Sequence, residues 1–312
     1  MKILIIGGTL FSGRALSSML HARGDDLVIA NRGKTPHDLP GEIERWTIDI
    51  GQPETLREAL ADRTFDACVH MIPGGTERTR AILEVLRGHV GRYLQCGSTG
   101  VYAPLRYCPA DESHPADPPD ELGGFRGKLE ADEEAARLCG EWGLPLTVLR
   151  PTNIMGTGTV PIDIWGARNP QFFQRVLDGK VISIPDDGQA LLQPVHKDDL
   201  ARAFVLALDN DCAHGVYNIT SDYAMTLDYY VQTVGTILGK EPVIEHVPSE
   251  ELLRRHPDPK KLNPSGLAFL RLHMCFTIEK AQRELGYQPQ WQPEDALEQN
   301  LEWVASEGLI SR

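Results

Sequence analysis

The sequence predicts an α/β protein built on a doubly wound parallel sheet, with a smaller α/β lobe toward its C-terminal end. Three observations indicate this: short apolar runs recur in the first half of the chain, stretches with helical patterning separate them, and this rhythm loosens beyond Arg150. The chain has 312 residues, more than the ~100–200 residues of a usual domain. We therefore expect one large core and a lobe.

The expected strands are short and almost entirely apolar. Such strands are typical of parallel sheets that helices cover on both faces, because neither side of the strand meets water. Stretches at 13–23 and 55–61 have helical patterning, as crossover connections between parallel strands require. The apolar runs are 3–6, 27–30, 67–72, 93–96 and 146–149.

The chain divides unequally into two parts. Residues 1–154 carry the alternation of strands and helices and are predicted to form the larger domain. Residues 155–312 contain loops with frequent proline and glycine and are predicted to form mostly a C-terminal substrate-binding lobe. A segment near 190–220 is expected to return to the larger domain.

Composition disfavours several classes of partner. The chain has 31 Lys and Arg against 44 Asp and Glu, and the resulting net charge of −13 repels phosphate backbones, so nucleic acid is an unlikely partner. No signal peptide and no run of ~18 apolar residues is found, so we expect a cytoplasmic protein without a membrane partner. Six widely spaced cysteines without a CxxC pair indicate reduced, mostly buried thiols and no metal site.

A glycine-rich turn follows the first expected strand and opens the first expected helix. Glycines there let the backbone approach a pyrophosphate, while the helix N-terminus offers N–H groups and a favourable dipole. This order of strand, glycines and helix predicts a Rossmann fold that binds a nicotinamide dinucleotide, although Leu10 replaces the middle glycine of a GxxGxxG pattern. The expected contacts are Gly7, Gly8, Thr9, Leu10, Phe11, Ser12 and Gly13.

The end of the second expected strand indicates which dinucleotide is preferred. NAD-specific sites usually place an acidic residue there for the ribose hydroxyls, but this chain has Asn31. Arg32 and Lys34 follow, and a guanidinium matches the geometry of a 2′-phosphate. NADP is therefore favoured and NAD is the alternative. The alternative for the two cations is a solvated loop.

Motifs over nearly the whole chain resemble the extended short-chain dehydrogenase/reductase superfamily, of the NAD-dependent epimerase/dehydratase type. Several motifs in the right order are more specific than any single one. A weaker likeness points to an atypical branch that includes chloroplast stem-loop-binding proteins. It consists of the bulky middle residue of the glycine turn, the Arg-Gly-Lys after the second strand, residues 127–130 and Gln193. The main motifs are Gly7-Gly8-Thr9 with Gly13, Asp49, 98–102, 128–130, 150–153, 195–200, 217–219 and 279–281.

The resemblance implies a catalytic Ser or Thr with a Tyr and a Lys in YxxxK spacing, where the Tyr exchanges a proton as hydride moves. Ser98 and Lys128 stand at the Ser and Lys positions. The Tyr position is Gly124, and the neighbouring Phe125 has no hydroxyl. Either another group does the acid–base work, or the usual reaction does not take place.

Candidate replacements for the missing Tyr lie in or just after the loop that follows Ser98. Tyr102 belongs more often to a structural Val-Tyr pair of the family, and Tyr107 comes shortly after it. His114 is expected either to close over a substrate or to be solvated. Ser98 itself either binds a substrate oxygen or caps its strand. The alternative role for Lys128 is to bind only the nicotinamide ribose.

The same resemblance implies further contact residues, for cofactor and for substrate. Asn153 matches an Asn that binds a substrate phosphate. The cofactor contacts expected outside the glycine turn and the second strand are Asp49, Ile50, Met71, Lys128 and Pro151, and the substrate contacts are Thr99, Asn153, Gln193 and His273.

Two departures from the family weaken the case for a nucleotide sugar as substrate. Thr99-Gly100 stands where a 4,6-dehydratase carries an Asp-Glu pair. Leu191-Leu192 stands near the place where sugar-nucleotide enzymes often hold a diphosphate with an Arg.

The sequence leaves three functions open. The first is an NAD(P)-dependent oxidoreductase or epimerase-like enzyme acting on a sugar, sugar nucleotide or similar polyol. The second is a sensor that binds the dinucleotide without turnover. The third, RNA binding or cleavage, is disfavoured by the net charge and by the lack of a basic run with interleaved aromatics. We also expect a homodimer, through helices around 76–86 and 129–139, as in many extended relatives.

Overall fold

The computed structural model describes residues 1–34, 39–258 and 261–311. The strands are β1 (Lys2–Ile6), β2 (Asp26–Asn31), β3 (Glu44–Thr47), β4 (Ala67–His70), β5 (Tyr93–Cys96), β6 (Leu146–Pro151), β7 (Asn153–Met155), β8 (Ile182–Pro185), β9 (Leu191–Leu192), β10 (Pro194–His196), β11 (Gly215–Ile219), β12 (Met225–Thr226) and β13 (Ile244–Val247). The helices are α1 (Phe11–Arg23), α2 (Pro53–Leu60), α3 (Thr76–Leu86), the 3₁₀ turns η1 (Thr99–Tyr102) and η2 (Asp120–Leu122), α4 (Gly123–Trp142), α5 (Pro170–Leu177), α6 (Lys197–Asp209), α7 (Leu227–Leu238), α8 (Ser249–Arg255), α9 (Pro264–Leu270), α10 (Glu279–Leu285) and α11 (Pro293–Ser306).

Seven parallel strands form the main sheet, in the order β11-β6-β5-β4-β1-β2-β3. The chain runs outward from β1 through β2 and β3, then crosses back to β4 and continues in the other direction. This is a doubly wound Rossmann-type sheet, so the predicted fold class is confirmed. Because the strand order reverses between β1 and β4, a crevice is expected at the carboxyl ends of these strands.

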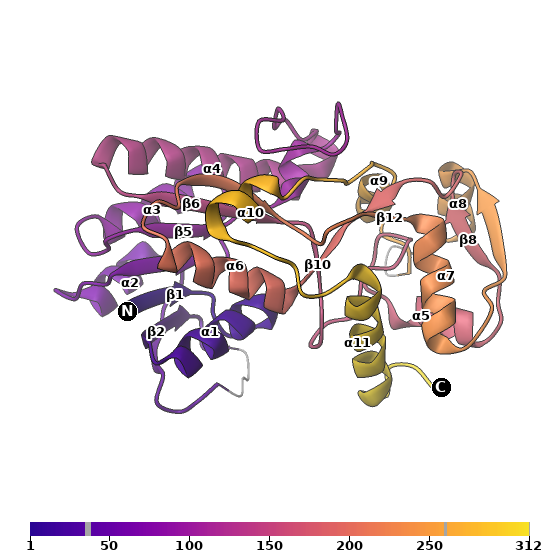
Figure 1. Cartoon of the computed structure of the whole chain (residues 1–312), viewed down its shortest axis with the longest axis horizontal. Coiled ribbons are helices and arrows are strands. Elements are labelled where there is room, and N and C mark those ends of the chain that lie inside the picture. The colour runs from indigo at the N-terminus through magenta and orange to yellow at the C-terminus, as the bar shows by residue number, and fades with distance from the viewer. Residues whose placement is uncertain (35–38, 259–260, 312) are drawn as a thin grey trace.

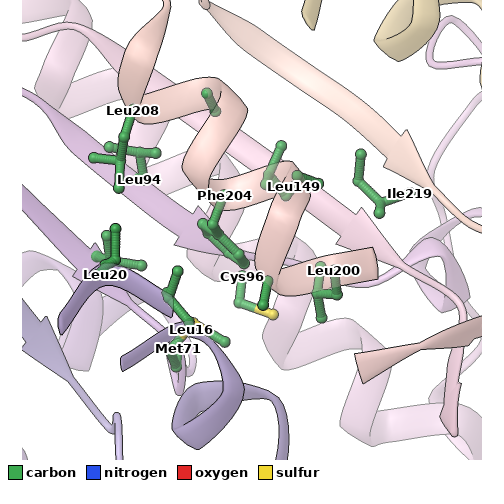
Figure 2. Close-up of a cluster of buried hydrophobic side chains, with 14 of the residues drawn as sticks. Leu16, Leu20, Met71, Leu94, Cys96, Leu149, Leu200, Phe204, Leu208 and Ile219 are labelled. Carbon is green, nitrogen blue, oxygen red and sulfur yellow. The ribbon is translucent and has the colours of Figure 1, made fainter. Parts of the chain in front are cut away.

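Helices cover both faces of the sheet. On one face α1 lies beside α6, and Leu16, Leu20, Phe204 and Leu208 from these two helices join one buried cluster with the strands (Figure 2). On the other face α2, α3 and α4 bury a separate cluster, to which α3 contributes Leu83. The strands are therefore buried on both sides, which explains their unbroken apolar sequences.

Another apolar cluster lies at the opposite end of the molecule, among α5, α7, α8, α9 and α11 (Figure 1). Its members come from 155–310, and Trp165, Phe172 and Tyr230 are among its largest side chains. The parallel pair of β8 and β13 forms one edge of this lobe.

Two segments of the second half of the chain return to the main sheet. The first contains α6 and β11, and β11 adds a strand beside β6. The second contains α10, which packs on β11 and places Ala281, Leu285 and the following Tyr287 in the cluster of α1 and α6. The sequence pattern predicts only the first return, because a helix of seven residues is too short for its apolar positions to indicate a partner.

The cysteines are not all buried. Cys68, Cys96 and Cys139 are buried and Cys275 is half-buried, but Cys108 and Cys212 are exposed, so the expectation of buried thiols is wrong for these two. Within the described ranges, no helix is long and apolar enough to cross a membrane.

Candidate functional site

A cavity of about 480 Å³ opens at the carboxyl ends of β1, β2, β3 and β4, and we call it the edge pocket. Its volume lies within the ~300–1,000 Å³ of small-molecule and cofactor sites. It sits where the strand order reverses, which is where doubly wound sheets bind their ligands. The lining residues are Gly7, Thr9, Leu10, Ser12, Gly13, Ala30, Asn31, Arg32, Gly33, Lys34, Ile48, Asp49, Ile50, Gly51, Met71, Ile72 and Arg78.

The glycine turn shapes one wall of the edge pocket. Gly7 has a φ of +94°, and a Cβ on Gly13 would lie 2.5 Å from the Gly7 carbonyl oxygen, so both positions require glycine. Gly8 serves packing, because its carbonyl accepts a hydrogen bond of 2.8 Å from the Ser17 hydroxyl. Leu10 provides no side-chain cap for α1, so the first N–H groups of the helix are left for an anion.

Polar and basic side chains at the end of β2 form the rim of the pocket. Asn31 donates from Nδ2 to Thr9 Oγ1 at 3.3 Å and accepts the Gly33 N–H at 2.7 Å, so it ties the glycine turn to the loop after β2. Arg32 and Lys34 are exposed on this loop and form no ion pair with any residue that the structure describes. Unpaired cations beside a cavity favour an anionic ligand.

Not all of the expected cofactor contacts line the edge pocket. Asp49, Ile50 and Met71 line it together with the β2 rim and all residues of the glycine turn except Gly8 and Phe11. Phe11 lines a second cavity instead. The Pro151 carbonyl accepts a hydrogen bond from Thr99 at 3.3 Å. Lys128 lies on α4, half-buried, beyond the lining of this pocket.

The loop after β5 contains the serine of the expected catalytic set. Ser98 Oγ accepts the N–H of Gly100 at 3.2 Å and so caps η1, which matches the structural alternative for this residue. Its side chain is only partly buried and keeps its own proton to donate. Thr99 is 1% exposed, and its hydroxyl is used by the Pro151 carbonyl.

The position at which the resemblance predicts a tyrosine faces open space and has an aromatic contact beside it. A Cβ on Gly124 would meet nothing within 4 Å, so this position faces open space. The ring of Phe125 packs on Gly100, where a Cβ would lie 2.2 Å from it, and also contacts Phe269 of α9 at a centroid distance of 4.8 Å. An aromatic contact between α4 and the lobe therefore lies beside Ser98, with no hydroxyl from either ring.

The proposed substitutes for the tyrosine are largely occupied by structural contacts. Tyr102 is 1% exposed, and burial raises its pKa to about 12. His114 is 3% exposed; its Nε2 accepts the Arg106 N–H at 2.8 Å, and its Nδ1 lies 2.8 Å from the Pro115 carbonyl. The histidine expected to be solvated or to close over a substrate is thus buried, with both ring nitrogens in use. Tyr107 is exposed and contacts the His114 ring.

A chain of buried polar side chains runs beneath the loop after β5. His70 Nδ1 lies 2.6 Å from Tyr93 Oη, and Gln95 donates to Asp132 at 2.7 Å. Arg150 completes the chain by donating to Asp132 at 2.9 Å. Burial is the largest influence on these groups: it lowers the pKa of His70 to about 3, with help from the positive charges of Lys128 and Arg78, and it raises the pKa of Asp132.

A second cavity, of about 470 Å³, borders the first through Leu10. Asn153, the residue matched to a substrate phosphate, lines it. Arg168 lines it too and donates to the carbonyls of Val160 and Ile154. The complete lining is Leu10, Phe11, Thr152, Asn153, Ile154, Gly158, Thr159 and Arg168.

The remaining expected substrate contacts do not gather at this cavity. Gln193 is 1% exposed: its amide nitrogen donates to the carbonyls of Ser221 and Phe276, and its Oε1 accepts the Phe276 N–H at 2.7 Å. It therefore holds the lobe segment at Phe276 in place. His273 is exposed on the same segment.

Sequence reasoning missed two basic residues of the site. Arg78 lines the edge pocket from α3, and Arg168 lines the second cavity from the loop before α5. Neither belongs to a motif, and only the fold brings them to the cavities. Among the residues that the structure describes, no group of three or more His, Cys, Asp and Glu is arranged to hold a metal ion.

Comparison with known proteins agrees with this architecture. Two solved structures have the same fold at 20% sequence identity: UDP-glucose 4-epimerase from Thermotoga maritima with UDP-glucose (TM-score 0.77, 98% of this chain and 99% of that chain) and dTDP-glucose 4,6-dehydratase from Bacillus anthracis with NAD (TM-score 0.78, 98% and 97%).

Sequence relatives and a family model identify the family. The chloroplast stem-loop binding protein of 41 kDa b from Arabidopsis thaliana is 30% identical over 93% of this chain and 75% of its own length. A UDP-glucose 4-epimerase from Corynebacterium glutamicum is 25% identical over 93% and 91%. The model of the NAD dependent epimerase/dehydratase family matches residues 3–220. The chain therefore belongs to the NAD-dependent epimerase/dehydratase family.

Proposed function

We propose that this protein is an NAD(P)-dependent oxidoreductase or epimerase-like enzyme that acts on a sugar, sugar nucleotide or similar polyol. The observation that carries the proposal is the edge pocket, where a glycine wall, uncapped helix amides and cations without an ion-pair partner among the described residues meet at the crevice of the sheet. A bound nicotinamide dinucleotide would supply hydride transfer. The chain would hold its phosphates at α1 and its adenosine between Asn31 and Asp49.

The proposed cofactor preference is for NADP over NAD. An acidic side chain at the end of β2 would repel a 2′-phosphate, but Asn31 has no charge and is engaged with Thr9 and Gly33. Arg32 and Lys34 stand beside it without carboxylate partners in the described part of the chain. Both cations are free to pair with the additional phosphate of NADP.

The proton transfer step is assigned here to Ser98 and Lys128. Ser98 keeps a hydroxyl proton that can bond a substrate oxygen. Lys128 is half-buried on α4, close enough for its charge to act on His70 of β4 and Cys96 of β5, and a lysine side chain offers N–H donors. Tyr102 and His114 rank behind them, because Tyr102 has a raised pKa and both nitrogens of His114 are occupied.

The second cavity is the proposed substrate site. It borders the edge pocket through Leu10, and Asn153, Thr159 and Arg168 give it polar and positive groups. Such groups suit a hydroxylated or phosphorylated substrate. Relatives and structural neighbours named as acting on or holding UDP-glucose and dTDP-glucose support the same class.

The test is direct. Purified protein is incubated with NADP or NAD and a panel of sugars and sugar nucleotides, and turnover is followed by cofactor absorbance and by chromatography of the sugars. Turnover of a member of the panel supports the proposal. Dinucleotide binding without turnover supports instead a sensor, which the open Gly124 position and the Phe125–Phe269 contact favour. Binding of neither dinucleotide contradicts both.

The proposed assembly is a homodimer formed through α3 and α4. Their outer surfaces contain charged groups in ion pairs, such as Arg80 with Glu134 and Arg137 with Glu141, and small exposed residues such as Gly140. Light scattering measures the mass of the particle. A Gly140→Arg variant should dissociate a dimer of this geometry, whereas a monomeric mass for the unmodified protein contradicts it.

A further inference from the structure

Arg78 reaches the edge pocket from the first turn of α3. It is exposed, and its Nη1 lies 3.5 Å from the position that a Cβ on Gly74 would take, so the side chain folds back over the loop between β4 and α3. The N–H of Gly75 donates to the Gly127 carbonyl of α4 at 2.9 Å. The loop beneath Arg78 is therefore fixed, and it keeps the guanidinium at the pocket.

Arg78 lacks the partners that other arginines of α3 have. Arg80 donates to Glu134 at 2.7 Å, and Arg87, directly after the helix, lies 4.9 Å above the Trp142 ring. Arg78 has no hydrogen bond, ion pair or ring contact with the residues described here. A guanidinium carries a permanent charge and five donors. An unpaired one that lines a cavity, in a chain of net charge −13, is a binding group for an anion.

The position of Arg78 differs from that of the two cations at the rim. α1 packs on one face of the sheet and α3 on the other, and the first turn of each reaches the edge pocket. Arg32 and Lys34 instead follow β2. A phosphate resting on the amides at the start of α1 therefore has Arg78 on the opposite side of the sheet edge, whereas a phosphate on the adenosine ribose lies at the β2 rim.

We propose that Arg78 binds the pyrophosphate that NAD and NADP share, and so closes a clamp with the amides of α1. This inference rests on the proposed function, because it requires a dinucleotide in the edge pocket. The amides provide hydrogen bonds without a formal charge, and Arg78 provides the compensating charge. Arg78 thus strengthens the binding of both dinucleotides equally, while Arg32 and Lys34 discriminate between them.

The experiment is calorimetric titration of NADH and of NADPH into the unmodified protein, Arg78→Ala, Arg78→Lys and Arg32→Ala. We expect Arg78→Ala to raise both Kd values by the same factor, about 10- to 100-fold for the loss of charge-assisted hydrogen bonds. Arg78→Lys should recover part of this loss, since it keeps the charge but not the planar fork. Arg32→Ala should weaken NADPH only. The effect of Arg78→Ala should shrink at high salt.

The matched control is Arg87→Ala, which removes the same charge at the far end of α3 and should leave both Kd values unchanged. Because Arg78 is exposed and unpaired, we expect Arg78→Ala to keep the Tm of the unmodified protein. Unchanged Kd values in Arg78→Ala overturn the inference. A loss confined to NADPH also overturns it, because Arg78 would then act on the 2′-phosphate. If the unmodified protein binds neither dinucleotide, the proposed function itself fails.

Discussion

The edge pocket and the loop after β5 lie at the same edge of the sheet, but they keep different amounts of the family's chemistry. The edge pocket has its glycines, the free amides of α1 and a basic rim. The loop after β5 contains Ser98, but the position at which the resemblance predicts a tyrosine is Gly124, which faces open space beside the ring of Phe125.

This difference shows that the two tasks depend on different parts of the molecule. A dinucleotide site depends mainly on backbone shape and helix termini, and both are compatible with many different side chains at positions such as Leu10. Proton transfer depends on one group within hydrogen-bond reach of the reacting atom. Under the proposed function, the residue at position 124 therefore bears on proton transfer but not on the dinucleotide site.

The largest expected effect comes from returning the missing hydroxyl. Gly124→Tyr places a phenol four residues before Lys128, where a Cβ has open space. We expect turnover of a reactive substrate to rise by about 10²–10⁴-fold, the usual contribution of a positioned acid or base. The control is Gly41→Tyr, between β2 and β3, where a Cβ also has open space. No increase would mean that this loop does not present a substrate to residue 124, and would favour the sensor.

The second prediction concerns the buried polar side chains beneath the loop after β5, which we expect to stabilise the folded protein. Asp132→Ala leaves Arg150, only 6% exposed, without its carboxylate. We expect a loss of about 3–5 kcal/mol in the free energy of unfolding, measured by denaturant titration. Arg57→Ala, which breaks an exposed pair with Glu54, should cost about 1 kcal/mol or less. Equal losses in the two variants would contradict the structural role of Asp132.

The edge pocket is tested at Gly13, the pocket glycine at which an added Cβ would lie closest to a backbone atom. Gly13→Ala puts a methyl group 2.5 Å from the Gly7 carbonyl oxygen, so the turn must shift. From the ~1–3 kcal/mol typical of overpacking, we expect the Kd for NADPH to rise about 10- to 100-fold. Gly41→Ala meets nothing within 4 Å and should bind normally. Normal binding by Gly13→Ala would show that the phosphates do not rest on this turn.

A pH dependence of stability is expected from His70. Its pKa is about 3 in the folded protein and about 6.5 when unfolded, so the unfolded chain binds more protons between these values. The free energy of unfolding therefore falls as pH falls through this window, by about 1.4 kcal/mol per pH unit for this group. Asp163, with a pKa of about 6 raised by burial, acts in the opposite direction.

The contribution of His70 is isolated by comparing the unmodified protein with His70→Gln. Denaturant titrations between pH 7 and pH 4 should show a shallower fall with decreasing pH in the variant. Identical pH profiles would mean that His70 is not kept neutral in the folded protein.

Features encoded within short stretches of sequence were predictable. The apolar runs at 3–6 and 93–96 became β1 and β5, and most residues of the glycine turn line a pocket. Two other expectations fared differently. Gln193, judged by resemblance, and His114, judged by its place in the loop after Ser98, are held by backbone contacts that their positions in the sequence do not reveal. No sequence pattern indicated Arg78 as a site residue, because its place at the pocket depends on which helix ends meet the crevice of the sheet.

By itself, the sequence determined the sheet, the glycine turn, the basic rim after β2 and the absence of a tyrosine before Lys128, because each of these is a local pattern of neighbouring residues. Only the tertiary structure decided which charges stand unpaired at a cavity and which polar side chains are already occupied. Those properties arise between residues far apart in the chain, such as Asp132 with Arg150, or α1 with α3 across the sheet. Pairing and burial depend on where the whole chain places each group, and no single stretch of sequence contains that information.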